Sequence, residues 1–348
     1  IGSGRYILKQ WDKGQQVIFE ANPDYYGEKA KIKKVTVLFM DEDAALAAAM
    51  AGEVDVAHTA ASLADEKIDG YGLLSVTSVD NRGINLPTVK ASEKDGKTVG
   101  NDVTSDVAIR RAMNIGIDRE EMIKNVLNGH GTAAYSVCDK MPWYNEESEV
   151  TYDQKSAKAL LEEAGWKEGK DGIREKDGVR AEFTVMFNPD DSVRQALAED
   201  FANQCKELGI EVKTEGAGWD VAYDKALSQP LVWGWGAHTP MELYNIYHTG
   251  TDSDSAEYSP YANETVDHYM DEALQADTLE DSYDLWKKAQ WDGTTGVTQD
   301  GDIPWIWFCN VDHLYYVRDG LKVAEQKIHP HGHGWSIVNN VDQWEWSK

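Results

Sequence analysis

A short segment rich in tryptophan and histidine carries the first candidate chemistry. It reads Trp-Gly-Trp-Gly-Ala-His over residues 233–238, and His248 follows ten residues later. Indole rings offer flat apolar faces with a hydrogen-bonding edge, and imidazole is a common ligand of nickel and zinc. We therefore predict that Trp233, Trp235, His238 and His248 contact a ligand, with the two histidines as candidate metal ligands. Loop histidines that face water are the alternative.

Three alternating histidines near the carboxyl end are a second candidate. His329, His331 and His333 would point to one face of an extended segment, and three neutral imidazoles on one face can hold a divalent transition metal. Pro330 and the neighbouring glycines disfavour a regular strand, however. A packing role is therefore the favoured interpretation of this run, and a metal site is the alternative.

Arg82 is the third candidate, within the stretch 73–86, which is predicted to be extended and to cross between two lobes. A guanidinium group can bind a ligand carboxylate through two parallel hydrogen bonds. Its alternative role is an ion pair with one of the 61 acidic residues.

Signatures of common enzyme classes are absent from the sequence. It contains no Gly-x-Ser-x-Gly, no phosphate-binding loop, no His-Glu-x-x-His and no Gly-x-Gly-x-x-Gly that opens a helix. The sequence therefore predicts a binding protein rather than an enzyme, with no required cofactor. A secreted hydrolase acting on polysaccharide is the competing hypothesis, because such an enzyme needs only two carboxylates.

Composition narrows the class of partner. The 348 residues include 34 basic and 61 acidic side chains, which give a net charge of −27. That charge argues against nucleic acid and against anionic membrane surfaces, and it suits a soluble, self-repelling protein outside the cell. Cys138, Cys205 and Cys309 allow at most one disulfide.

Two strand–helix–strand units organise the predicted fold. The first has strands at 32–40 and 53–58 around an alanine-rich helix at 41–50, and the second has strands at 181–187 and 210–215 around a helix at 191–208. Each such unit predicts a parallel strand pair. Two α/β lobes joined by crossing strands would enclose a ligand cleft.

The remaining expected elements are shorter. They are a hairpin over 5–21, helices at 107–116, 119–128, 153–164, 219–227, 264–275 and 280–289, a strand at 231–235, a long loop over 236–263, an inserted hairpin at 291–304, and a strand at 303–308 continued by 313–318.

Four segments, in order, resemble family-5 extracellular solute-binding proteins, the peptide- and nickel-binding receptors of ABC importers. They are Gly-Ser-Gly-Arg-Tyr at 2–6 with Asn-Pro-Asp-Tyr-Tyr-Gly at 22–27, Met-Ala-Gly-Glu-Val-Asp at 50–55, DVAIRRAMNIGIDREEMI at 106–123 and DQKSAKALLEEAG at 153–165. Arg5 stands where the family usually has proline.

This resemblance implies a two-lobed α/β fold of the type II periplasmic binding proteins, here lacking its N-terminal part because the chain begins with Ile1 rather than Met. It places residues 1–82 in lobe I, 83–312 in lobe II and 313–348 back in lobe I. The implied protein is monomeric, extracellular or periplasmic, and lipid-anchored only through an N-terminal part absent here. It would capture a short peptide or a chelated nickel-type metal ion, as cargo, between the lobes and deliver it to an ABC permease. A non-transport sensor with the same fold is the alternative.

The resemblance also favours one branch of the family. Trp235-Gly-Ala matches a loop of the nickel-binding branch, in which His238 replaces a proline, and His248 corresponds to a histidine that approaches the metal there. Peptide receptors often carry an Asp in this loop, whereas residues 239–240 are Thr-Pro. Nickel or another divalent transition metal is therefore the slightly favoured cargo.

Overall fold

The computed structural model describes residues 2–250, 260–332 and 337–347. Contacts divide the chain into two compact units, of which unit 1 comprises Ile1–Ser78 and Asp312–Lys348 and unit 2 comprises Val79–Val311. The sequence predicts divisions after residues 82 and 312. No helix in the described ranges is both long and apolar enough to cross a membrane.

Unit 1 contains two antiparallel three-stranded sheets. Its elements are β1 (Tyr6–Asp12), β2 (Gln16–Ala21), β3 (Lys34–Leu38), α1 (Glu42–Met50), β4 (Val56–Thr59), η1 (Ala61–Leu63), β5 (Tyr71–Val76), β17 (His313–Arg318), β18 (Leu321–Lys322), η3 (Ile337–Gln343) and β19 (Glu345–Trp346). One sheet has the order β1-β2-β3, and the other has the order β4-β17-β5. The predicted hairpin over 5–21 is confirmed, with Gly14 at a positive φ in its turn.

The first predicted parallel pair is wrong. β3 pairs with β2, and β4 pairs antiparallel with β17, so the two strands that flank α1 belong to different sheets. The partner of β4 comes from more than 250 residues further along the chain, as the pairing Leu314–Thr59 shows, and local spacing carries no information about it. β3 is half exposed, because alternate residues face solvent.

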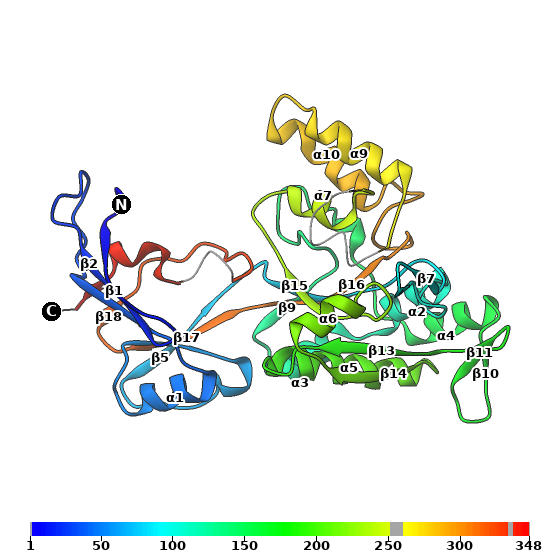
Figure 1. The fold of residues 1–348 in the computed structure, drawn as a ribbon, viewed down its shortest axis with the longest axis horizontal. Helices are drawn as coiled ribbons and strands as arrows, with labels where there is room; N and C mark the ends of the chain where they lie inside the picture. The colour runs from blue at the N-terminus through cyan, green and yellow to red at the C-terminus, as the bar shows by residue number, and fades with distance from the viewer. Residues whose placement is uncertain (1, 251–259, 333–336, 348) are drawn as a thin grey trace. The chain divides into compact units, whose positions relative to one another are not determined.

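Unit 2 holds the second strand–helix–strand unit. Its elements are β6 (Asn81–Asn85), β7 (Ser92–Lys94), β8 (Lys97–Val99), α2 (Val107–Gly116), α3 (Arg119–Leu127), β9 (Gly131–Ala133), η2 (Glu146–Ser148), α4 (Gln154–Glu163), β10 (Lys167–Glu168), β11 (Arg174–Lys176), β12 (Val179–Arg180), β13 (Glu182–Phe187), α5 (Ser192–Glu207), β14 (Glu211–Gly216), α6 (Trp219–Lys225), β15 (Val232–Trp235), α7 (Met241–Tyr247), α9 (Glu264–Leu274), α10 (Leu279–Gln290) and β16 (Trp305–Val311). β13 and β14 pair in parallel through α5, as predicted, and α5 lies along both strands (Figure 1).

Three other sequence expectations are corrected. The loop predicted over 236–263 contains the helix α7, and the segment 291–304 contains no strand and therefore no hairpin. The strand expected to continue from 303–308 into 313–318 is divided, since β16 joins the sheet β15-β6-β16-β9 of unit 2 and β17 joins a sheet of unit 1.

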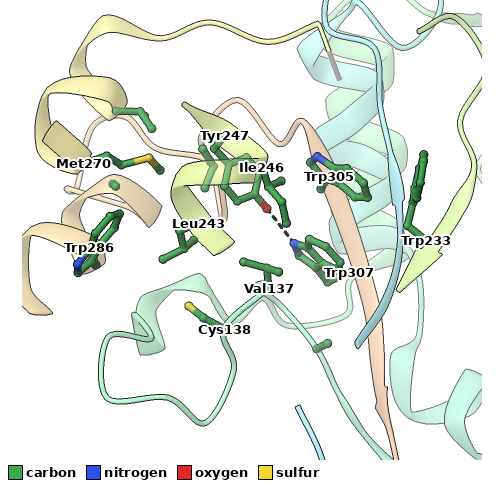
Figure 2. Close-up of a cluster of buried hydrophobic side chains, with 14 of the residues drawn as sticks. Val137, Cys138, Trp233, Leu243, Ile246, Tyr247, Met270, Trp286, Trp305 and Trp307 are labelled. Atoms are coloured by element: carbon green, nitrogen blue, oxygen red, sulfur yellow. Dashed lines mark hydrogen bonds between the residues drawn. The ribbon is translucent and has the colours of Figure 1, made fainter. Parts of the chain in front are cut away.

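Tryptophan side chains fill much of the core of unit 2. Trp286, Trp305 and Trp307 are almost completely buried, and the Trp307 Nε1–H donates to the Tyr247 hydroxyl at 3.0 Å (Figure 2). The rings of Trp305 and Trp307 stack at 5.1 Å. Trp233 of β15 belongs to the same buried cluster, so both β15 and β16 are anchored in this core. All three cysteines are buried free thiols.

Candidate functional site

The topology of unit 2 gathers several loops at one edge of its strands. β13 and β14 are parallel, and a parallel bridge between Met186 and Leu231 aligns β15 with them. The loops that follow these three strands therefore lie at the same edge. β6 runs antiparallel to β15, with Asn81 opposite Trp235, so the start of β6 lies at this edge too. Ligands of α/β proteins commonly bind outside the carboxyl ends of parallel strands.

Four aromatic rings form a wall at this edge, which we call the aromatic wall. They are Trp219 and Tyr223 of α6 and Trp233 and Trp235 of β15. Trp233 stacks on Trp235 at 5.9 Å, and Trp219 stacks on Tyr223 at 5.6 Å. The two pairs meet where the Trp233 ring lies 6.4 Å from that of Trp219.

The two predicted tryptophans have different roles in this wall. Trp233 is buried, and its Nε1–H donates to Asn85 Oδ1 at 2.9 Å, so it belongs to the core. Trp235 is half buried, and its Nε1–H finds no acceptor among the residues that the structure describes. Trp235 is therefore the better placed of the two for ligand contact.

The loop after β15 has a fixed shape. Gly236 has φ +129°, and a Cβ at this position would lie 1.8 Å from the Val79 carbonyl oxygen, so no other residue fits there. The Gly236 N–H donates to Glu242 Oε1 at 3.1 Å. Burial raises the pKa of Glu242 to about 7. Gly236 and Glu242 together hold the exposed His238 on this loop.

His248 is separated from His238 by helix α7. The helix has seven residues, which span about 10 Å at 1.5 Å per residue. The His248 Nε2 lies 3.1 Å from Asp271 Oδ1, and its ring stacks on Tyr244 at 4.2 Å. His248 therefore packs against α9, at the opposite end of α7 from His238.

Arg82 pairs with an acidic neighbour. Its guanidinium bonds the Asp80 carboxylate and donates from Nη1 to the Asn81 carbonyl oxygen at 2.9 Å. Its Nε–H has no acceptor within the described part of the chain. The ion pair that the sequence left as the alternative is thus present, and the guanidinium still lacks one acceptor.

A second arginine lies near Arg82 and was not predicted. Arg194, in the first turn of α5, bonds the Asp191 carboxylate, and its guanidinium lies 5.6 Å from the centre of the Trp219 ring. Burial, followed by the positive charge of Arg82, lowers the Arg194 pKa. Sequence periodicity could not have found this residue, because the charge that acts on it, that of Arg82, comes from a distant part of the sequence.

The histidine run near the carboxyl end lies in unit 1. His329 is fully buried, with Nδ1 at 2.9 Å from His313 Nδ1 and Nε2 at 3.1 Å from Gln326 Oε1, so both ring nitrogens have protein partners. His331 is half buried, and His333 lies outside the described residues. Within the described ranges, no three His, Cys, Asp or Glu side chains are grouped to hold a metal ion. These contacts support a packing role for His329.

Comparison with known proteins identifies relatives of this chain. The family model described as bacterial extracellular solute-binding proteins, family 5, middle, matches residues 1–257. Protein XP55 of Streptomyces lividans is 33% identical, over 92% of this chain and 57% of XP55. The oligopeptide-binding protein AppA of Bacillus subtilis is 31% identical, over 78% of this chain and 51% of AppA. The chain thus spans about half the length of these relatives.

Solved structures agree with these matches. NikZ from Campylobacter jejuni, in complex with Ni(L-His), superposes with a TM-score of 0.80 and 25% identity, over 99% of this chain and 68% of NikZ. AppA from B. subtilis, in complex with a nonapeptide, superposes with a TM-score of 0.74 and 25% identity, over 100% of this chain and 67% of AppA. The predicted fold, that of the type II periplasmic binding proteins, is confirmed.

Proposed function

We propose that this chain, which belongs to the family 5 bacterial extracellular solute-binding proteins, captures a small solute outside the cytoplasm and delivers it to an ABC permease. The observation that carries the proposal is the edge of unit 2 described above. There, an indole that lacks a hydrogen-bond acceptor among the described residues, an exposed histidine and two largely buried guanidinium groups come from the ends of separate elements and the loop after β15. Flat apolar faces beside a few fixed polar groups are typical of small-molecule sites.

A chelated nickel-type metal ion is the favoured cargo. Trp235 offers an apolar face, His238 offers an imidazole to an incomplete coordination sphere, and the arginines suit the carboxylates of a chelator. NikZ, which superposes over nearly all of this chain, was solved with Ni(L-His). The metal is then cargo rather than a cofactor.

A short peptide is the second candidate cargo. The B. subtilis AppA that matches this chain is named an oligopeptide-binding protein and was solved with a nonapeptide. The sequence Thr239-Pro240 after His238 lacks an acidic partner for a peptide amino group, which makes this candidate the weaker one.

Native mass spectrometry of the protein purified without denaturation tests the proposal. A mass increment that matches a nickel complex, or a ladder of peptide masses, identifies the cargo class directly. Calorimetric titration with Ni(II)–L-histidine and with penta-alanine then measures the affinity of each class. Failure to retain or bind either probe contradicts the proposed function.

Capture without turnover separates this proposal from the hydrolase hypothesis. We expect no release of reducing sugar from a panel of polysaccharides at any pH between 4 and 8. Uptake of the identified cargo by cells, dependent on an adjacent permease and ATPase, separates transport from a sensor role. Uptake that is unchanged when the gene is deleted would favour the sensor.

A further inference from the structure

We propose that Arg194 and Arg82 form a carboxylate-binding subsite beside the aromatic wall, and that the cargo of this protein carries a carboxylate which it presents to Arg194. The proposal rests on the proposed function and specifies which chemical group of the solute is recognised. Arg194 is the new member of the site, and Arg82 supports it from β6.

Four charged side chains form the subsite. Asp80 and Arg82 stand at the start of β6, and Asp191 and Arg194 stand where β13 leads into α5. Each guanidinium bonds one carboxylate, Arg82 with Asp80 and Arg194 with Asp191. The two pairs come from neighbouring elements, since β13 is bridged to β15 at Met186–Leu231 and β15 pairs with β6. Burial, followed by the positive charge of Arg82, lowers the Arg194 pKa, in keeping with this arrangement.

The cluster has more hydrogen-bond donors than acceptors. Two guanidinium groups provide ten N–H donors, and among the described residues their acceptors are two carboxylates and the Asn81 carbonyl oxygen. The Asp191 carboxylate is further occupied, since its Oδ1 also accepts the Arg194 backbone N–H at 2.9 Å as the cap of α5. The Nε–H of each arginine is buried and has no acceptor in the described part of the chain. Buried donors of this kind are costly unless an acceptor arrives.

A carboxylate is the acceptor that this cluster fits best. The amino end of α5 adds a partial positive charge at Asp191, and it is a helix of 16 residues. Guanidinium groups bind carboxylates in a planar, two-bonded geometry. A buried ion cluster contributes little to stability by itself, and recognition of a solute is the role that we assign to this one.

Arg194 is the guanidinium group next to the aromatic wall. Arg194 keeps 12% and Arg82 11% of the side-chain surface exposed, and of the two carboxylates Asp191 keeps 28% and Asp80 5%. Arg194 also lies 5.6 Å from the centre of the Trp219 ring. A solute that packs on the wall would therefore meet Arg194 first, because Arg194 is the guanidinium group in contact with a ring of the wall.

Paired probes that differ only in a carboxylate test the proposal. The first pair is Ni(II)–L-histidine and Ni(II)–histamine, which share the imidazole and amine donors. The second pair is penta-alanine and its C-terminal amide. We expect the wild-type protein to bind the carboxylate member of whichever pair it recognises at least tenfold more tightly, as measured by calorimetry.

Variants of Arg194 then assign the preference to this residue. We expect Arg194→Gln to weaken binding of the carboxylate probe about tenfold to a hundredfold and to leave the probe without the carboxylate unchanged. Arg194→Lys keeps the positive charge but not the planar guanidinium group. Its affinity for the carboxylate probe should therefore lie between those of the wild type and Arg194→Gln. The control is Lys206→Gln, which removes an exposed positive charge from the other end of α5 and should change neither affinity.

The outcomes separate the two proposals. If the wild type binds one probe pair without a carboxylate preference, or if Arg194→Gln keeps the preference, the subsite is wrong while the proposed function stands. An equal loss for both members of a pair indicates a structural role for Arg194 and also overturns the subsite. If the wild type binds none of the four probes, the proposed function itself fails, and the subsite fails with it. Circular dichroism and thermal unfolding confirm that each variant is folded.

Discussion

At the scale of single residues, Glu242 has two opposing effects. Its carboxylate accepts the Gly236 N–H and so fixes the loop that carries His238. Burial raises its pKa to about 7 from the ordinary 4.5, which means that the folded protein holds the proton more tightly than the unfolded chain. The residue therefore helps to position the loop and reduces the stability of the ionised protein.

This raised pKa predicts a pH-dependent stability. For a carboxyl group with a raised pKa in the folded state, the stability contribution is complete below pH 4.5 and is lost as the pH rises through about 7. A shift of this size corresponds to about 3 kcal/mol. We expect Glu242→Gln, which keeps an acceptor for Gly236, to lose less stability between pH 5 and pH 8 than the wild type.

Denaturant unfolding followed by tryptophan fluorescence measures this effect. The matched control is Glu163→Gln, an exposed position at the end of α4, which should follow the wild type at every pH. Parallel stability curves for Glu242→Gln and the wild type would contradict the role of burial at this carboxyl group. Burial also raises the pKa of Asp139 to about 7. Asp139 is present in both the wild type and Glu242→Gln, so its contribution to the pH dependence of stability is the same in the two.

His238 supports a second prediction at this scale. If the cargo is a nickel chelate, we expect His238→Ala to weaken binding of Ni(II)–L-histidine about tenfold to a hundredfold, because a coordination position is vacated. The control is His268→Ala, another exposed histidine, on α9. Replacing His329 should leave chelate affinity unchanged while it destabilises unit 1, since His329 is buried and bonded on both sides. If only the His329 variant loses binding, the assignment of the site to the loop that carries His238 is wrong.

At the scale of elements, the loop between β15 and α7 depends on one glycine. We expect Gly236→Ala to destabilise the protein by several kcal/mol and to abolish cargo binding, because its Cβ would collide with the Val79 carbonyl oxygen. Gly293→Ala is the control. Gly293 also has a positive φ, of 92°, but a Cβ there meets no atom within 4 Å, so only the backbone strain of about 1 kcal/mol applies. Equal effects of the two substitutions on unfolding would contradict the collision.

The sequence predicts local elements well and long-range pairings poorly. The unit β13–α5–β14 follows from local periodicity and a short connection, and both its strands pair as expected. The connection from α1 to β4 is also short, like that from α5 to β14, yet the pairing partner of β4 is β17, which comes from the far end of the chain. The same limit applies to the site. Trp235 and Arg82 can be singled out from the sequence, because their residue types stand on predicted strands. The role of Arg194 depends on its neighbours in the folded protein, which the sequence does not show.

At the scale of the whole molecule, the net charge of −27 affects stability as well as solubility. The 61 acidic side chains exceed the 34 basic ones by 27, so the folded protein concentrates repelling carboxylates. Unfolding spreads these charges apart and relieves the repulsion, which makes the native state less stable at low ionic strength. The ion pairs at the surface oppose this trend only weakly, since exposed pairs contribute about 1 kcal/mol or less each.

We therefore expect added salt to stabilise this protein. Raising potassium chloride from about 10 mM to about 150 mM shortens the screening length from roughly 30 Å to roughly 8 Å, which removes most of the long-range repulsion. The melting temperature at pH 8 should rise over this range and level off beyond it. A monovalent chloride is the right salt, because sulfate strengthens apolar burial and divalent cations can bind as cargo. A melting temperature that falls with potassium chloride would show that attractive pairs outweigh the net charge. In that case the surplus carboxylates would be spaced so that their repulsion does not destabilise the native state.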